Sequence, residues 1–169
     1  MKIVWFNGPS MKQFLDIPLQ DVEVGCNFIR SLRSVHHVCA FDQQVVDRIE
    51  QEKNVSYWTR SRCLIHGFKT PESKWPSYDS GTLALNLASV ISEDPIYLLG
   101  FDWSETDESI FNKLYTWRKH NPTKASSPKT KLIMNIATTN NIIVVHKNKK
   151  DFLGAGIEWI GPNEFRDLI

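Results

Sequence analysis

The chain has few cysteines, almost no net charge and no long apolar run, and each shortage excludes a class of protein. Its three cysteines, Cys26, Cys39 and Cys63, form no Cys-x-x-Cys pair, so the sequence carries no readable zinc knuckle or redox motif. The 20 basic and 19 acidic residues leave a net charge of +1, so general binding to nucleic acid is not expected. No apolar run approaches the roughly 18 residues that span a bilayer. The N-terminus also lacks a secretory signal, so we expect a cytoplasmic protein without a membrane span.

What is present is the composition of a globular domain. The 169 residues are 41% hydrophobic and 23% charged, which suits one domain over residues 1–169 with a core of its own. There is no internal repeat, and self-association into a homo-oligomer stays open.

Short apolar runs alternate with helical patterns along the chain. This order predicts an α/β fold with three layers, a mainly parallel Rossmann-like sheet with helices on both faces. The expected strands are Lys2–Phe6, Val22–Cys26, His37–Phe41, Ser56–Trp58 or Cys63–His66, Ile96–Leu99, Ile142–His146 and a late edge strand at Ile157–Ile160. The expected helices are Gln43–Lys53, Gly81–Ser92, Glu105–Arg118 and Pro128–Asn140.

Two segments, Gly67–Asp79 and Lys119–Lys131, have no periodicity and contain two prolines each. Long loops in compact domains are often lids or binding loops. The lysines of the second segment could hold phosphates, although a solvated surface explains them equally well.

The first predicted strand runs directly into Asn7-Gly8-Pro9-Ser10. A buried strand followed by a tight turn is how open α/β sheets present backbone N–H groups to a phosphate. Gly8 allows close approach of a ligand, Pro9 fixes φ, and Ser10 offers a hydroxyl. The alternative is a plain connection between a strand and a helix.

Small polar residues follow other predicted strands at the same edge of the sheet. Asn27 follows the second strand and Asp42 the third, while Asp102 and Trp103 follow Ile96–Leu99. Ser80-Gly81-Thr82 opens a helix, whose free N–H groups could bind an anion. Asp102 could accept hydrogen bonds from a sugar hydroxyl, and Trp103 could stack on a ring. The alternative reading is that these residues only cap helices and fill the core.

Four motifs together resemble a known group of enzymes. They are Asn7–Ser10, Cys26-Asn27, Ser80–Thr82 and Ile96–Trp103, and in this order they are similar to motifs of the bacterial sialyltransferases of glycosyltransferase family 42. Related proteins include the motility accessory factors of flagellin glycosylation and an archaeal pterin pyrophosphokinase. The similarity covers most of the chain, although this chain is much shorter than those enzymes.

The resemblance implies a binding site for a nucleotide sugar of the CMP-sugar type. Its contacts would be Asn7, Gly8, Pro9, Ser10, Asn27, Ser80, Gly81, Thr82, Asp102 and Trp103. The family's catalytic base is a histidine in a loop, where this chain offers His120. That histidine could activate an acceptor hydroxyl, or it could simply stabilise the end of a helix. Asp102 and Asp42 are the other candidate bases.

These observations predict a small transferase that moves a glycosyl group from a nucleotide sugar without a metal cofactor. Its acceptor is unknown. One alternative is pyrophosphoryl transfer with Mg²⁺ held by Asp42 and Asp102. The other is a protein that binds a nucleotide without turning it over.

Overall fold

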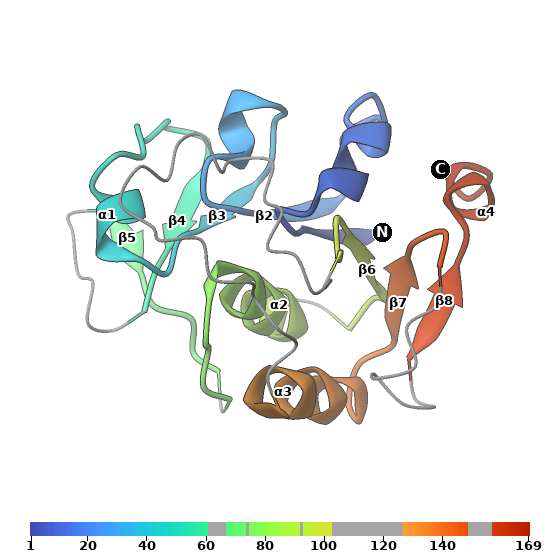
Figure 1. Cartoon of the computed structure of the whole chain (residues 1–169). Helices are drawn as coiled ribbons and strands as arrows, with labels where there is room; N and C mark the ends of the chain where they lie inside the picture. Colours follow the sequence, from blue (N-terminus) through green and yellow to red (C-terminus); the bar gives the residue numbers. More distant parts are fainter. Residues whose placement is uncertain (61–66, 74, 92, 103–126, 149–156) are drawn as a thin grey trace.

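The computed structural model shows an eight-stranded sheet between two layers of helices (Figure 1). It describes residues 1–60, 67–73, 75–91, 93–102, 127–148 and 157–169. The expected helix Glu105–Arg118 and the alternative strand Cys63–His66 lie outside these residues.

All strands of the sheet are parallel. Their order is β5-β4-β3-β2-β1-β6-β7-β8. The strands are β1 (Lys2–Trp5), β2 (Val22–Cys26), β3 (His37–Cys39), β4 (Ser56–Trp58), β5 (Phe68–Lys69), β6 (Ile96–Leu99), β7 (Ile142–Val145) and β8 (Glu158–Ile160). The predicted α/β class is therefore confirmed, and the sheet is parallel throughout these strands.

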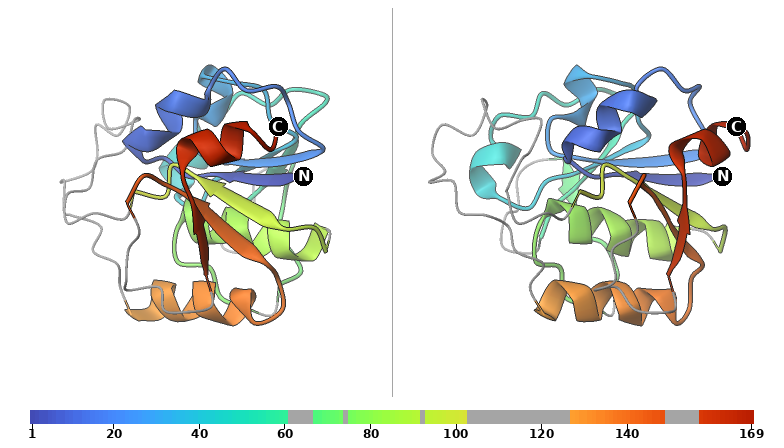
Figure 2. Two further views of the ribbon diagram at one scale, coloured as in Figure 1. Left: turned by 90° about the vertical axis from the view of Figure 1, so that its right-hand side faces the viewer. Right: turned by 45° about the vertical axis from the view of Figure 1, so that its right-hand side comes forward.

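Helices cover both faces of the sheet (Figures 1 and 2). One face carries η1 (Pro9–Phe14), η2 (Ile29–Ser31) and α4 (Pro162–Arg166), and the short α1 (Gln43–Val46) packs into the same core. The other face carries the two longer helices, α2 (Ser80–Ile91) and α3 (Ser127–Ala137).

The sheet separates two hydrophobic clusters, because successive side chains of each strand point to opposite faces. Ile3 and Trp5 of β1 join the cluster beneath η1 and α4. Val4 of the same strand joins the cluster with Leu83 of α2 and Ile133 of α3. The central strands β1, β2, β6 and β7 are thus largely buried on both faces, which explains why they read as continuous apolar runs.

The helix expected at Gln43–Lys53 was too long by more than a turn, because α1 ends at Val46. Beyond it, Arg48 N–H bonds the Val45 carbonyl in a tighter turn. The Tyr57 hydroxyl then donates to the Glu50 carbonyl at 3.2 Å. This contact ties the chain after α1 to β4, where the helical pattern alone would continue.

The predicted helices Gly81–Ser92 and Pro128–Asn140 correspond to α2 and α3 and shift only at their ends. Strand β5 and the short helices η1, η2 and α4 were not predicted, because each has six residues or fewer and gives too little periodicity.

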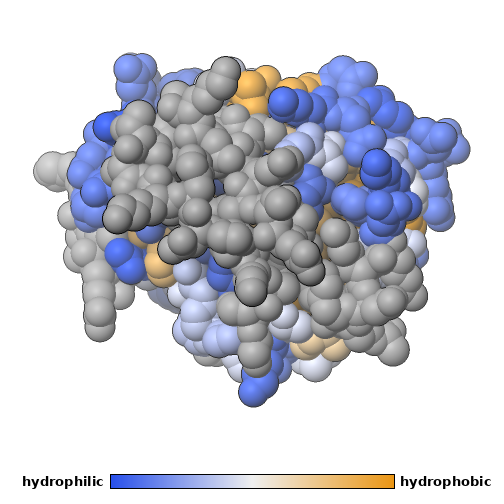
Figure 3. Space-filling view, in the orientation of Figure 1, coloured by the Kyte–Doolittle hydropathy of each residue, from blue (hydrophilic) through white to orange (hydrophobic). Residues whose placement is uncertain are grey.

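Hydrophilic side chains cover the described surface around η1 and α4 in the space-filling view (Figure 3).

Candidate functional site

Strand order places a switch point between β1 and β6. The chain builds β1 to β5 toward one edge of the sheet and then returns to place β6 on the other side of β1. Ligands of open α/β sheets bind beyond the carboxyl ends of the strands at such a point.

Two glycines bring the loops after β1 and β6 into contact. The Gly8 N–H donates to the Gly100 carbonyl at 3.0 Å. A Cβ on Gly8 would lie 2.4 Å from that oxygen, and one on Gly100 would lie 2.6 Å from the Phe6 carbonyl oxygen. Gly100 also has a φ of +70°, which side chains disfavour. Both positions therefore need glycine for the approach of two backbones.

The Gly8 and Ser10 N–H groups of the Asn7–Ser10 loop have partners within the chain. Ser10 N–H donates to Asp102 Oδ2 at 2.5 Å, and Met11 N–H donates to the Gly8 carbonyl at 3.1 Å. Pro9 has no N–H. The carboxylate of Asp102 thus takes the place at this loop where the sequence analysis expects a phosphate.

Two buried polar atoms of the same loop lack such partners. Asn7 Oδ1 and Ser10 Oγ are shielded from solvent and make no hydrogen bond within the described part of the chain. Leaving a buried polar atom unpaired costs about 1–3 kcal/mol. The loop at the switch point therefore keeps two unsatisfied polar atoms.

Asp102 also faces a histidine that the sequence analysis did not select. His146 Nε2 lies 3.1 Å from Asp102 Oδ1, and the two side chains are only 9% and 13% exposed. His146 Nδ1 lies 3.0 Å from both the N–H and the carbonyl oxygen of Asn148. The neutral ring can accept from that N–H, and the protonated ring can donate to that carbonyl. Asp102 thereby links the ends of β1, β6 and β7.

The signal for His146 was present, since it directly follows β7 at the carboxyl edge of the sheet. The strand order was needed to show that β7 lies next to β6. The predicted base His120 and the predicted stacking residue Trp103 lie outside the described residues.

Asn27 and Ser80, predicted from separate motifs, are joined directly. Ser80 Oγ donates to Asn27 Oδ1 at 2.5 Å and accepts from the Phe41 N–H at 3.1 Å. Asn27 has a φ of +53°, and its N–H donates to the Cys39 carbonyl at 2.8 Å. One serine therefore ties the ends of β2 and β3 to the start of α2.

The cysteines of this region are structural. Cys26 Sγ donates to the Ser80 carbonyl at 3.3 Å, and both Cys26 and Cys39 are fully buried. Burial raises the pKa of each thiol well above its ordinary value. Neither is a thiolate nucleophile at neutral pH.

The first turn of α2 is capped by Asp79 rather than by Ser80. Asp79 Oδ1 accepts from the Thr82 N–H at 2.8 Å, and its Oδ2 forms an ion pair with Lys129 of α3. Thr82 is fully buried and Gly81 packs against the Phe6 ring. The helix start thus already carries a carboxylate, which offsets its attraction for other anions.

The carboxylates considered for Mg²⁺ lie at separate strand ends. Asp42 follows β3 and Asp102 follows β6, with β2 and β1 between them. At about 4.8 Å per strand the two strand ends are about 14 Å apart, too far for one ion to bind both. Among the described residues, no three histidine, cysteine or acidic side chains are grouped to hold a metal ion.

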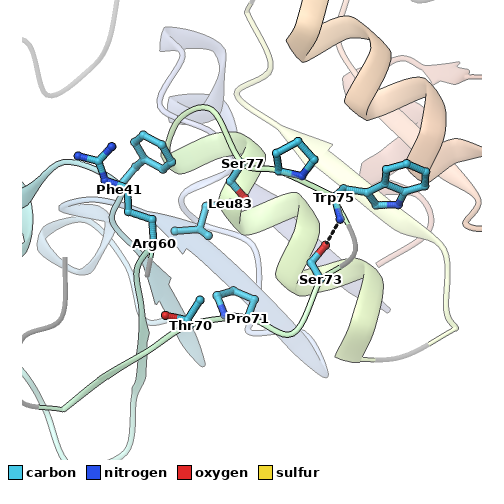
Figure 4. Close-up of a pocket in the computed structure, with 9 residues that line it drawn as sticks. Phe41, Arg60, Thr70, Pro71, Ser73, Trp75, Ser77 and Leu83 are labelled. Carbon is cyan, nitrogen blue, oxygen red and sulfur yellow. Dashed lines mark hydrogen bonds between the residues drawn. The ribbon is translucent and has the colours of Figure 1, made fainter. Parts of the chain in front are cut away.

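A pocket of about 450 Å³ opens beside this site, beyond the ends of β3, β4 and β5 (Figure 4). Phe41 and Arg60 line one side, and Leu83 of α2 forms the floor. The other side is lined by Thr70, Pro71, Ser73, Trp75, Pro76 and Ser77. The 67–79 segment is a candidate binding loop in the sequence, whereas no sequence pattern marks Phe41 or Arg60.

Comparison of the chain with protein-family models, with curated proteins and with solved structures finds no match in any of the three. In the part of the chain that the structure describes, no helix has the length and apolar character needed to cross a bilayer.

Proposed function

We propose that this chain is a transferase that binds a nucleotide-activated sugar at the carboxyl edge of its sheet, between β1 and β6. The observation that carries the proposal is the pair of unpartnered buried atoms, Asn7 Oδ1 and Ser10 Oγ, on the loop at the switch point. A nucleotide offers both kinds of partner: ribose hydroxyls can donate to Asn7 Oδ1, and phosphate oxygens can accept from the Ser10 hydroxyl.

Adjacent groups support the same ligand. Asn27 and Ser80 form a rigid hydrogen-bonded pair at the neighbouring strand end, which suits recognition of a ligand with many hydroxyls. The resemblance of these motifs to sialyltransferases of glycosyltransferase family 42 favours a CMP sugar as the donor.

The resemblance also favours transfer without a metal, and the distance between Asp42 and Asp102 argues against the Mg²⁺-dependent alternative. A cytoplasmic location and homo-oligomerisation belong to the same proposal.

A second candidate function is nucleotide binding without turnover. Both Asp102 oxygens and both His146 nitrogens face partners within the chain. A general base must reach the proton of the acceptor, and in this arrangement each of these atoms already faces a group of the chain. His120 and Asp42 are the other candidate bases.

The test is a thermal-shift panel of CMP, CDP, UDP, GDP and ATP, with and without Mg²⁺. A ligand at 100 times its dissociation constant stabilises the fold by about 2.7 kcal/mol, which raises the midpoint by several degrees. We expect a response to CMP without metal that Asn7→Ala and Ser10→Ala abolish. The control Asn163→Ala alters an exposed asparagine of α4 and should leave the response unchanged.

Other outcomes contradict the proposal. A response that needs Mg²⁺ and a triphosphate would favour pyrophosphoryl transfer, and no response to any nucleotide would remove the nucleotide site altogether. Binding of a CMP sugar without release of CMP over hours would favour the second candidate.

A further inference from the structure

Asp102 places a carboxylate directly on the loop where the nucleotide is proposed to bind. Its Oδ2 accepts from the Ser10 N–H at 2.5 Å, and a Cβ built on Gly8 would lie 2.5 Å from the same oxygen. The Asp102 side chain is only 13% exposed, so water screens its charge less than at an exposed position. The carboxylate therefore lies within one residue of the Ser10 hydroxyl.

The neighbour of Asp102 on its other side is a histidine rather than a permanent cation. His146 Nε2 lies 3.1 Å from Asp102 Oδ1, and an imidazole carries a charge only when it is protonated. Within the described part of the chain, Asp102 forms no ion pair with a lysine or an arginine. A ligand at this loop therefore meets the carboxylate without a basic side chain paired to it.

Glycosyl transfer raises the negative charge of the phosphate in the ligand. In a CMP sugar the phosphate is a diester with one negative charge. During transfer the bond between the anomeric carbon and the phosphate oxygen breaks, and that oxygen keeps the electron pair. The anomeric carbon bonds to the acceptor oxygen, whose proton passes to a base. The CMP that is released is a monoester, and its phosphate carries close to two negative charges above pH 7.

The distance between the phosphate and Asp102 is short enough for this extra charge to matter. Because the Ser10 N–H contacts Asp102 Oδ2, a phosphate bonded to the Ser10 hydroxyl lies within about 9 Å of that oxygen. One additional negative charge at this distance from a partly buried carboxylate changes a dissociation constant by about tenfold.

We infer, on the basis of the proposed function, that Asp102 determines specificity at this site. It favours the singly charged phosphodiester of a nucleotide sugar over the doubly charged nucleotide that transfer releases. Repulsion by Asp102 thereby weakens the binding of the product and promotes its release.

The test is isothermal titration calorimetry on the full chain at pH 8 with CMP and with its methyl ester, cytidine 5′-methylphosphate, which keeps a single charge. We expect the wild type to bind the ester about tenfold more tightly than CMP. Asp102→Asn keeps an acceptor for the Ser10 N–H but not the charge. It should abolish the preference, because it strengthens CMP binding about tenfold more than it strengthens binding of the ester.

The matched control removes a carboxylate elsewhere. Asp47 is exposed at the end of α1, and Asp47→Asn should leave both affinities unchanged. An equal gain for CMP and the ester in Asp102→Asn, or equal changes in Asp102→Asn and Asp47→Asn, would overturn the inference.

Thermal unfolding of each variant shows whether it is folded. If Asp102→Asn does not fold, the wild type decides the outcome through its two affinities. Binding of CMP as tight as that of the ester, or tighter, would then overturn the inference.

The same titrations separate this inference from the proposed function. Binding of both ligands with a preference that Asp102→Asn does not alter would reject the role of Asp102 and keep the nucleotide site. If neither ligand binds to the wild type or to Asp102→Asn, the nucleotide site is rejected and the role of Asp102 with it.

Discussion

Asp102 Oδ1 and His146 Nε2 lie 3.1 Å apart across the ends of β6 and β7, while the other Asp102 oxygen accepts from the Ser10 N–H. We expect Asp102→Ala to lower the free energy of unfolding by about 1–3 kcal/mol, because it leaves a partly buried N–H and imidazole without their partner. Asp102→Asn keeps an acceptor for Ser10 and should cost less.

Urea unfolding of Asp102→Ala, His146→Ala and the double variant measures their coupling. Because the two residues are in contact, the double variant should lose less free energy of unfolding than the two single variants together. We expect the difference to be about 0.5 kcal/mol or more. Strictly additive losses would show that the pair contributes nothing.

The contact between the loops after β1 and β6 makes a prediction about glycine. Gly8→Ala and Gly100→Ala should each destabilise the fold by about 3 kcal/mol or more, because a Cβ meets backbone oxygens at 2.4 and 2.6 Å. Gly161 is the matched control, since a Cβ there has no neighbour within 4 Å. Its alanine variant should lose less than about 1 kcal/mol. Similar unfolding midpoints for all three would refute the close approach.

Much of this fold can be predicted from the sequence because parallel strands buried on both faces appear as apolar runs. Seven of the eight strands coincide with predicted runs, and only Phe68–Lys69 does not. The rule that ligands bind beyond carboxyl strand ends also indicated Asn27 and Ser80, which the structure joins by a hydrogen bond.

The rest of the site depends on which strands and loops are neighbours. His146 acquires its role only because β7 pairs with β6. The pocket brings together Phe41, Arg60 and six residues between positions 70 and 77. Asn86 holds three of those six by hydrogen bonds, but the helical periodicity of the sequence indicates only that its position is buried. Sequence order carries no direct information on such neighbours.

The buried His37 side chain should make the stability of the fold depend on pH. Its Nδ1 accepts from the Trp58 indole N–H at 3.2 Å, and burial, with smaller effects from His36 and Lys69, lowers its pKa below the ordinary value of 6.5. The folded state therefore binds fewer protons than the unfolded state as the pH falls through this range. The stabilisation is present above pH 6.5 and is lost as the pH falls through the folded-state pKa.

Urea unfolding between pH 7.5 and pH 5 checks this dependence. We expect the wild type to lose more stability over that interval than His37→Gln, whose amide does not titrate. An equal loss in both proteins would assign the pH dependence to other groups.

The buried side chain of Lys2 should contribute to the stability of the fold. Its side chain is fully buried, and its Nζ donates at 2.8 Å to the carbonyl of Ala88, in the last turn of α2. Such carbonyls lack partners within the helix. Lys2→Met keeps the apolar stem but not the donor, and it should cost about 1–3 kcal/mol. Lys2→Ala should cost more, because it also leaves a cavity. If Lys2→Met unfolds at the wild-type urea concentration, the bond contributes nothing to stability.

Asn86 connects stability with the shape of the pocket. Asn86→Ala removes the partners of the Ser73 and Ser77 hydroxyls and of the Trp75 carbonyl, so we expect a loss of about 2–4 kcal/mol. Hydrogen exchange should also rise at the Trp75 amide, whose N–H donates to Ser73 Oγ at 3.2 Å, because the freed segment opens locally. Asn135→Ala, on the more exposed α3, is the control and should alter neither quantity. Destabilisation with unchanged exchange at Trp75 would show that Asn86 supports the helix layer but does not hold the pocket wall.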